Sequence, residues 1–106
     1  MANELKRELA ALRRRIDALN REILARVQER GEVVLEVAEV KRHLGLEALD
    51  PMREEEMLRT LARETSGPFD AGDVREIFTA ILRASRRLHD RTPVAETATA
   101  AGRRER

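Results

Sequence analysis

The sequence contains no cysteine, tryptophan or tyrosine, and it has only two phenylalanines and two histidines. Without cysteine the chain can form no disulfide, thiolate nucleophile or cysteine-based zinc site, and two histidines argue against a structural metal site. The scarcity of aromatic rings argues against a surface on which single-stranded nucleic acid stacks. The 21 Lys and Arg residues nearly balance the 20 Asp and Glu residues, which argues against nucleic acid or a charged membrane surface as a partner.

Long apolar runs are also missing from the chain. No stretch approaches the roughly 18–20 residues that cross a bilayer, and the first ten residues lack the apolar core of a signal peptide. Apolar residues still make up 42% of the chain, which is enough for a folded domain. We therefore expect one small soluble domain in the cytoplasm, without a structural metal site.

The first half of the chain carries one continuous helical pattern. Apolar residues recur at steps of three and four from Leu5 to Leu44, and no proline interrupts them before Pro51. The pattern predicts a single helix over about residues 4–43 that ends near Gly45. Such a helix is roughly 60 Å long, whereas a compact domain of 100 residues has a radius of gyration of ~13 Å. The residues that follow cannot cover it, so we expect a second copy of the chain to pack against it.

Two shorter helices should follow, each introduced by an aspartate. Asp50 is suited to the N-cap of the second helix, with Pro51 in the first helical position, and this helix should end before Gly67. Asp70 is suited to the N-cap of a third helix that should end near Arg91. No segment shows the alternation of a strand. The predicted fold class is all-α, with three helices of very unequal length.

The last residues differ in composition from the rest of the chain. Residues 92–106 are rich in alanine and threonine, lack an apolar stripe and end in a basic cluster. We therefore assign residues 1–91 to the helical domain and interpret residues 92–106 as a flexible tail or linker.

Three cations interrupt the apolar stripe of the first helix. Arg30 and Lys41 occupy stripe positions, and Arg13 lies at the edge of the stripe. One such cation can reach water along its aliphatic stem, but three on one helix make that explanation less satisfactory. Arg30 and Lys41 share a face about 16.5 Å apart. In an antiparallel pair of first helices, with a two-fold axis near residues 24–25, Arg13 of the partner subunit would lie opposite about residue 36, between them.

The second and third helices add polar groups to their own apolar faces. Glu54 lies on the second stripe with Arg53 beside it, and Ser85 and His89 end the third stripe. A glutamate favoured by the helix dipole, an exposed arginine and a frayed helix end are simpler explanations. With Asp50, the cluster holds four cations against two carboxylates, an excess of two positive charges. Because unpaired buried cations are costly, the excess predicts a small dianionic ligand held by arginine forks.

The chain resembles the all-helical chorismate mutases over about residues 5–91. The resemblance rests on the order and spacing of the segments LRRRIDALNREIL, ERGEVVLEVAEVK, DPMREEEML, GPF and IFTAILRAS. The DPxRE and GPF details are most similar to mutase domains fused to 3-deoxy-D-arabino-heptulosonate-7-phosphate synthase, so a fused or associated synthase is a candidate partner. The resemblance implies an intertwined homodimer that rearranges chorismate to prephenate without a cofactor.

The resemblance also implies roles for the three cations of the first helix. Arg30 and Arg13 of the partner subunit would clamp the carboxylates of the substrate. Lys41 would donate a hydrogen bond to the ether oxygen whose bond breaks, and would also contact a carboxylate. Chorismate is a dianion, which agrees with the excess of positive charge.

The remaining candidates belong to the second and third helices. By the same resemblance, Glu54 would accept the ring hydroxyl with Asp50 nearby, while Arg53 and Ser85 would complete the rim and the second carboxylate site. His89 stands where the family usually has Gln, sometimes Glu, as a second donor to the ether oxygen. If His89 replaces that donor, kcat/KM should titrate near neutral pH.

Three other functions stay open at this point. An isochorismate-pyruvate lyase shares the fold and a similar cationic pocket. A non-catalytic module could bind chorismate or prephenate and regulate a fused enzyme. A plain coiled-coil adaptor is disfavoured, because cations at Arg30 and Lys41 would weaken its interface.

Overall fold

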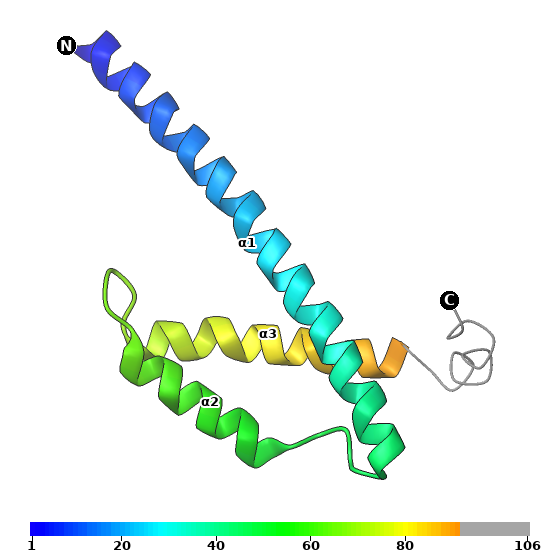
Figure 1. The fold of residues 1–106 in the computed structure, drawn as a ribbon. Helices are drawn as coiled ribbons and strands as arrows, with labels where there is room; N and C mark the ends of the chain where they lie inside the picture. Colours follow the sequence, from blue (N-terminus) through cyan, green and yellow to red (C-terminus); the bar gives the residue numbers. More distant parts are fainter. Residues whose placement is uncertain (92–106) are drawn as a thin grey trace. The chain divides into compact units, whose positions relative to one another are not determined.

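The described part of the chain consists of three helices. The computed structural model describes residues 1–91, so the predicted tail at 92–106 lies outside the described residues. The helices are α1 (Ala2–Leu44), α2 (Pro51–Glu64) and α3 (Ala71–Arg91) (Figure 1), and no strand occurs within residues 1–91. The prediction of an all-α chain with helices of very unequal length is confirmed.

The end of α1 is formed by a local hydrogen-bond motif at Gly45. The φ of Gly45 is +72°, in the left-handed region that favours glycine. Its N–H donates to the carbonyl of Arg42 at 3.2 Å, and the N–H of Leu46 donates to the carbonyl of Lys41 at 2.9 Å. This pair of bonds is a Schellman motif. It satisfies two terminal carbonyls of α1 and turns the chain toward α2.

Aspartates cap the starts of α2 and α3, as the sequence predicts. Asp50 Oδ1 accepts a hydrogen bond from the N–H of Arg53 at 3.2 Å, and Pro51 is the first residue of α2. At α3 the capping is reciprocal. The N–H of Asp73 donates to Asp70 Oδ1 at 2.8 Å, and the N–H of Asp70 donates to Asp73 Oδ2 at 3.3 Å. Each bond satisfies a backbone donor at the helix start.

Replacing Asp70 by alanine should lower the free energy of unfolding by about 1 kcal/mol, because a terminal N–H of α3 loses its side-chain acceptor. Denaturant unfolding followed by circular dichroism measures this loss. Asp90→Ala is the matched control at the opposite end of α3, where the helix dipole disfavours a carboxylate, and it should leave stability unchanged or raise it. An equal loss in both variants would contradict the capping role.

The described chain divides into two compact units, residues 1–32 and the residues from Val33 onward. The unit of residues 1–32 is the first part of α1. From Leu5 to Val27, the exposed fractions of its large apolar residues run from 37% at Val27 to 59% at Ile23. This part of α1 therefore presents an uncovered amphipathic stripe. No helix of the described chain is both long and apolar enough to span a membrane.

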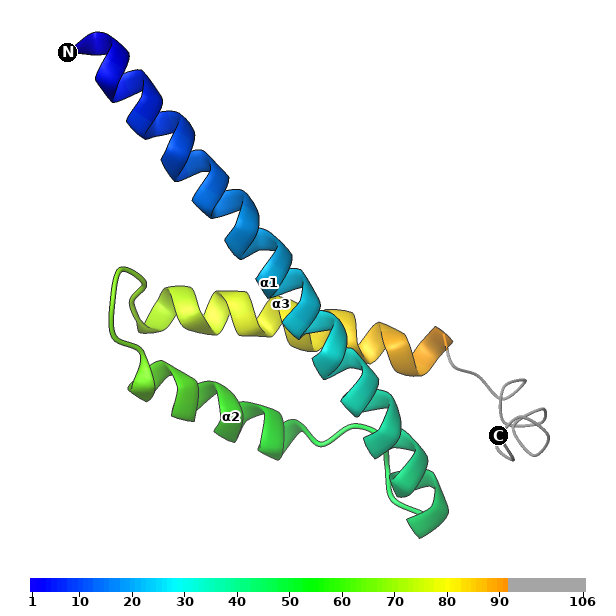
Figure 2. The same ribbon diagram turned by 45° about the horizontal axis from the view of Figure 1, so that its top comes forward.

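The unit that begins at Val33 contains α2 and α3, which run antiparallel beside each other (Figure 2). Leu58 of α2 and Leu82 of α3 are its buried apolar residues, each 8% exposed. The connection at residues 65–70 is held by the Thr65 hydroxyl, which donates to the carbonyl of Phe69 at 3.0 Å. This hairpin positions the side chains of the candidate site.

Candidate active site

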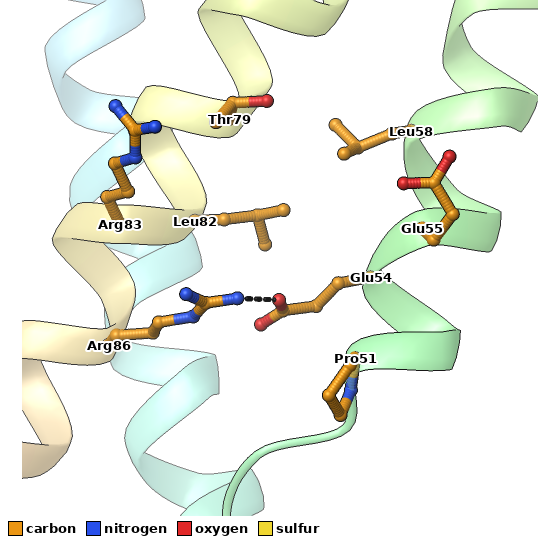
Figure 3. Close-up of a pocket in the computed structure, with 8 residues that line it drawn as sticks. All are labelled: Pro51, Glu54, Glu55, Leu58, Thr79, Leu82, Arg83 and Arg86. Carbon is orange, nitrogen blue, oxygen red and sulfur yellow. Dashed lines mark hydrogen bonds and ion pairs between the residues drawn. The ribbon is translucent and has the colours of Figure 1, made fainter.

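A cleft of about 240 Å³ lies between α2 and α3. Its lining comes from one face of each helix, at steps of three and four residues, so successive lining side chains stack along the cleft. Figure 3 shows Leu58 from α2 and Leu82 from α3 pointing toward each other, with the Glu54–Arg86 pair beside them. The lining residues are Pro51, Glu54, Glu55, Leu58, Thr79, Leu82, Arg83 and Arg86.

Glu54 meets Arg86 across this cleft. Arg86 Nη2 donates a hydrogen bond to Glu54 Oε1 (Figure 3). The side chain of Glu54 is 21% exposed and that of Arg86 is 48% exposed. Glu54 also lies in the first turn of α2, where the helix dipole favours a carboxylate. Glu54 thus has both an ion-pair partner across the cleft and a favourable position at the helix start.

Glu55 forms a second link between the same helices. Arg75 Nη2 lies 3.1 and 3.3 Å from the two carboxylate oxygens of Glu55. The side chains of Glu55 and Arg75 are 45% and 40% exposed. Pairs with this much exposure contribute at most about 1 kcal/mol to stability. The Glu54–Arg86 pair is distinguished by its more deeply placed carboxylate.

Ser85 and His89 lie on a partly buried face of α3. The simpler explanation of an exposed, frayed helix end therefore does not describe these two side chains. Ser85 Oγ donates to the carbonyl of Ile81 at 2.8 Å. That bond fixes the direction of the hydroxyl proton.

Lys41 is partly buried near the end of α1. Its Nζ donates to the carbonyl of Ala48 at 3.1 Å, and an ammonium group has further N–H donors for a ligand. Asp50 is exposed and is used as the N-cap of α2. Arg53 is also exposed, which agrees with its simpler interpretation as a surface arginine.

Arg13 and Arg30 belong to the unit of residues 1–32. The side chain of Arg13 is exposed and that of Arg30 is partly buried. The approach of these arginines to Lys41 and to the groups on α2 and α3 stays a prediction.

Arg86 is a cleft residue that is not among the predicted site residues. It follows Leu82 by four residues, the same spacing that places Leu82 after Phe78. Residues at this spacing share a helix face, so the sequence does carry a signal for it. The predicted face instead passes from Leu82 through Ser85 to His89.

The side chains of the candidate site can bind and orient a charged small molecule. Guanidinium and ammonium groups hold anionic groups, and a carboxylate such as that of Glu54 accepts a hydroxyl hydrogen bond. Within residues 1–91, no group of three or more His, Asp or Glu residues could hold a metal ion.

Comparison with known proteins identifies the family. Residues 12–90 match the family model of chorismate mutase type II. The chorismate mutase of Methanocaldococcus jannaschii is 37% identical over 60 residues, which cover 54% of this chain and 61% of that protein. Form I of the chorismate mutase from Thermus thermophilus has 45% sequence identity and a TM-score of 0.72, over 74% of this chain and 98% of that one. For form II the identity is 44% and the TM-score 0.76, over 79% and 96%. The chain therefore belongs to the chorismate mutase type II family.

Proposed function

We propose that the chain is an isomerase that rearranges chorismate to prephenate without a cofactor. The observation that carries the proposal is that Glu54, Ser85 and His89 lie on partly buried faces of α2 and α3 in a chain that belongs to this family. By resemblance to the family, Arg13, Arg30 and Lys41 would be the substrate-binding cations.

The proposed reaction needs positioning and charge stabilisation rather than a nucleophile. A carbon–oxygen bond breaks while a carbon–carbon bond forms within one molecule, so the two arms of the substrate must be held together. Arg30 and Arg13 of the partner subunit would pin the two carboxylates and supply this proximity. Lys41 and His89 would donate to the ether oxygen as it gains negative charge, and such a preorganised donor is worth about 3–4 kcal/mol.

The groups at the start of α2 would recognise the rest of the substrate. Glu54 would accept a hydrogen bond from the ring hydroxyl, with Asp50 nearby. Arg53 would complete the rim of the pocket, and Ser85 would contribute to the second carboxylate site. His89 would do the work of the family's more usual glutamine.

We also propose an intertwined antiparallel homodimer. The supporting observation is the uncovered apolar stripe from Leu5 to Val27, since full burial of each large apolar side chain contributes about 1.5–3 kcal/mol. A two-fold axis near residues 24–25 would bring Arg13 of the partner subunit toward the region between Arg30 and Lys41. Symmetry would then give two pockets, each completed by both chains.

A finer proposal concerns the partner enzyme. The DPxRE segment from Asp50 and the GPF segment at residues 67–69 support action beside, or fused to, a 3-deoxy-D-arabino-heptulosonate-7-phosphate synthase. In that case residues 92–106 would connect the two. A cytoplasmic location likewise stays a prediction.

Incubation of the purified chain with chorismate should consume it and yield prephenate, as followed by chorismate absorbance and by chromatography of the products. A parallel incubation with isochorismate tests the lyase alternative and should yield no salicylate. Release of salicylate with no action on chorismate would replace the mutase by the lyase. Chorismate binding in calorimetry without turnover would instead indicate a regulatory module.

A further inference from the structure

We infer that Arg86 is a positioning residue for the reaction, acting through Glu54. It holds the Glu54 carboxylate in place across the cleft between α2 and α3, and it neutralises that carboxylate beside a dianionic ligand. The inference rests on the proposed function and adds to it a residue outside the predicted site.

The geometry of the pair supports the positioning role. Glu54 is fixed to the first turn of α2, and Arg86 reaches it from α3, 32 residues away in sequence. Glutamate is among the side chains that lose most rotamer freedom on ordering. Because Arg86 already holds one carboxylate oxygen, this ordering takes place before the substrate arrives, and preorganisation of this kind favours catalysis.

The hydrogen-bonding capacity of Glu54 allows both interactions at once. An ionised carboxylate offers about four lone-pair sites on its two oxygens. Arg86 Nη2 uses Oε1, so the carboxylate can still accept a hydroxyl of the substrate. Arg86 therefore orients Glu54 without competing for the substrate.

Charge gives Arg86 a second effect. A carboxylate next to a dianionic substrate repels it, and this repulsion is strong where solvent screens poorly. The side chain of Glu54 is only 21% exposed, so screening by water is reduced. Arg86 offsets the negative charge of Glu54, and its loss should therefore weaken substrate binding as well as slow the chemical step.

The Arg75–Glu55 pair is a control that distinguishes this positioning role from a purely structural one. It joins the same two helices through the same residue types, and its side chains are 40% and 45% exposed. If Arg86 only tied α3 to α2, its loss would resemble the loss of Arg75. If Arg86 acts through Glu54, its loss should affect the reaction and that of Arg75 should not.

The test compares Arg86→Met, Arg75→Met, Glu54→Gln and the double variant E54Q/R86M, each in the full chain. We expect Arg86→Met to lower kcat/KM for chorismate by at least about tenfold, with KM raised and kcat lowered, while Arg75→Met stays within about twofold of wild type. The double variant should be no slower than Glu54→Gln, because coupled residues do not have additive effects. Arg86→Lys should recover part of the loss.

Either of two comparisons among the variants would overturn the inference. One is an equal effect of Arg86→Met and Arg75→Met; the other is a double variant whose loss is the product of the two single losses. If Arg86→Met fails to fold in circular dichroism, Arg86→Lys and Arg86→Gln take its place in the same comparison. No turnover by the wild type would overturn the proposed function and this inference together, whereas normal turnover by Arg86→Met would overturn the inference alone.

Discussion

Replacing Lys41 by alanine should lower kcat for chorismate by at least about two orders of magnitude, while the chain stays folded and forms the proposed dimer as the wild type does. The proposed bond from Lys41 to the ether oxygen strengthens as negative charge develops there, so its loss raises the barrier more than it weakens binding. Lys41 is partly buried, and its ammonium group is already held by the carbonyl of Ala48 at 3.1 Å. It is therefore positioned before the substrate binds, as a preorganised donor must be.

The chain offers a matched control for this substitution. Lys6 is the one other lysine of the sequence; it is exposed on α1, and Lys6→Ala should keep the activity of the wild type. Steady-state kinetics gives kcat for each protein, while circular dichroism and size-exclusion chromatography check folding and assembly. Equal kcat values for wild type and Lys41→Ala would reject the assignment of Lys41.

Helix ends were predictable from the sequence because short-range interactions form them. Asp50 and Asp70 each accept a hydrogen bond from the N–H three residues ahead, and the Gly45 motif bonds to the last turn of α1. Such contacts lie within a few residues of each other, so the local sequence specifies them. Sequence periodicity alone places Ser85 and His89 on the apolar face of α3, and both are partly buried there.

The pairing of Glu54 with Arg86 was not predictable in the same way. Periodicity assigns Glu54 to a face of α2 and Arg86 to a face of α3, but it does not give the register of one helix against the other. That register depends on the packing of side chains such as Leu58 and Leu82. The charge count made from the sequence therefore omits one cation, Arg86. When Arg86 is included, the excess of positive charge in the proposed pocket rises from two to three.

Mixing two impaired variants, Arg13→Ala and Lys41→Ala, should restore activity to about a quarter of the wild-type level when their subunits exchange at equal concentration. In the mixed dimer one pocket combines an intact Lys41 with an intact Arg13 of the partner subunit, while the other pocket lacks both. Random exchange puts about half of the chains into mixed dimers, and half of their pockets work. Each variant alone should show at most a small fraction of this activity.

The matched control mixes Lys41→Ala with Glu54→Gln. Both substitutions affect a pocket through the chain that carries them, so every pocket of this mixed dimer lacks one group and activity should not rise. Co-expression with two different affinity tags isolates each mixed dimer, and kcat is then measured per pocket. A failure of the Arg13→Ala and Lys41→Ala pair to regain activity, with the mixed dimer shown to form, would mean that Arg13 does not serve the pocket of its partner. The uncovered stripe from Leu5 to Val27 would still call for a covering chain, but the two pockets would then be independent of each other.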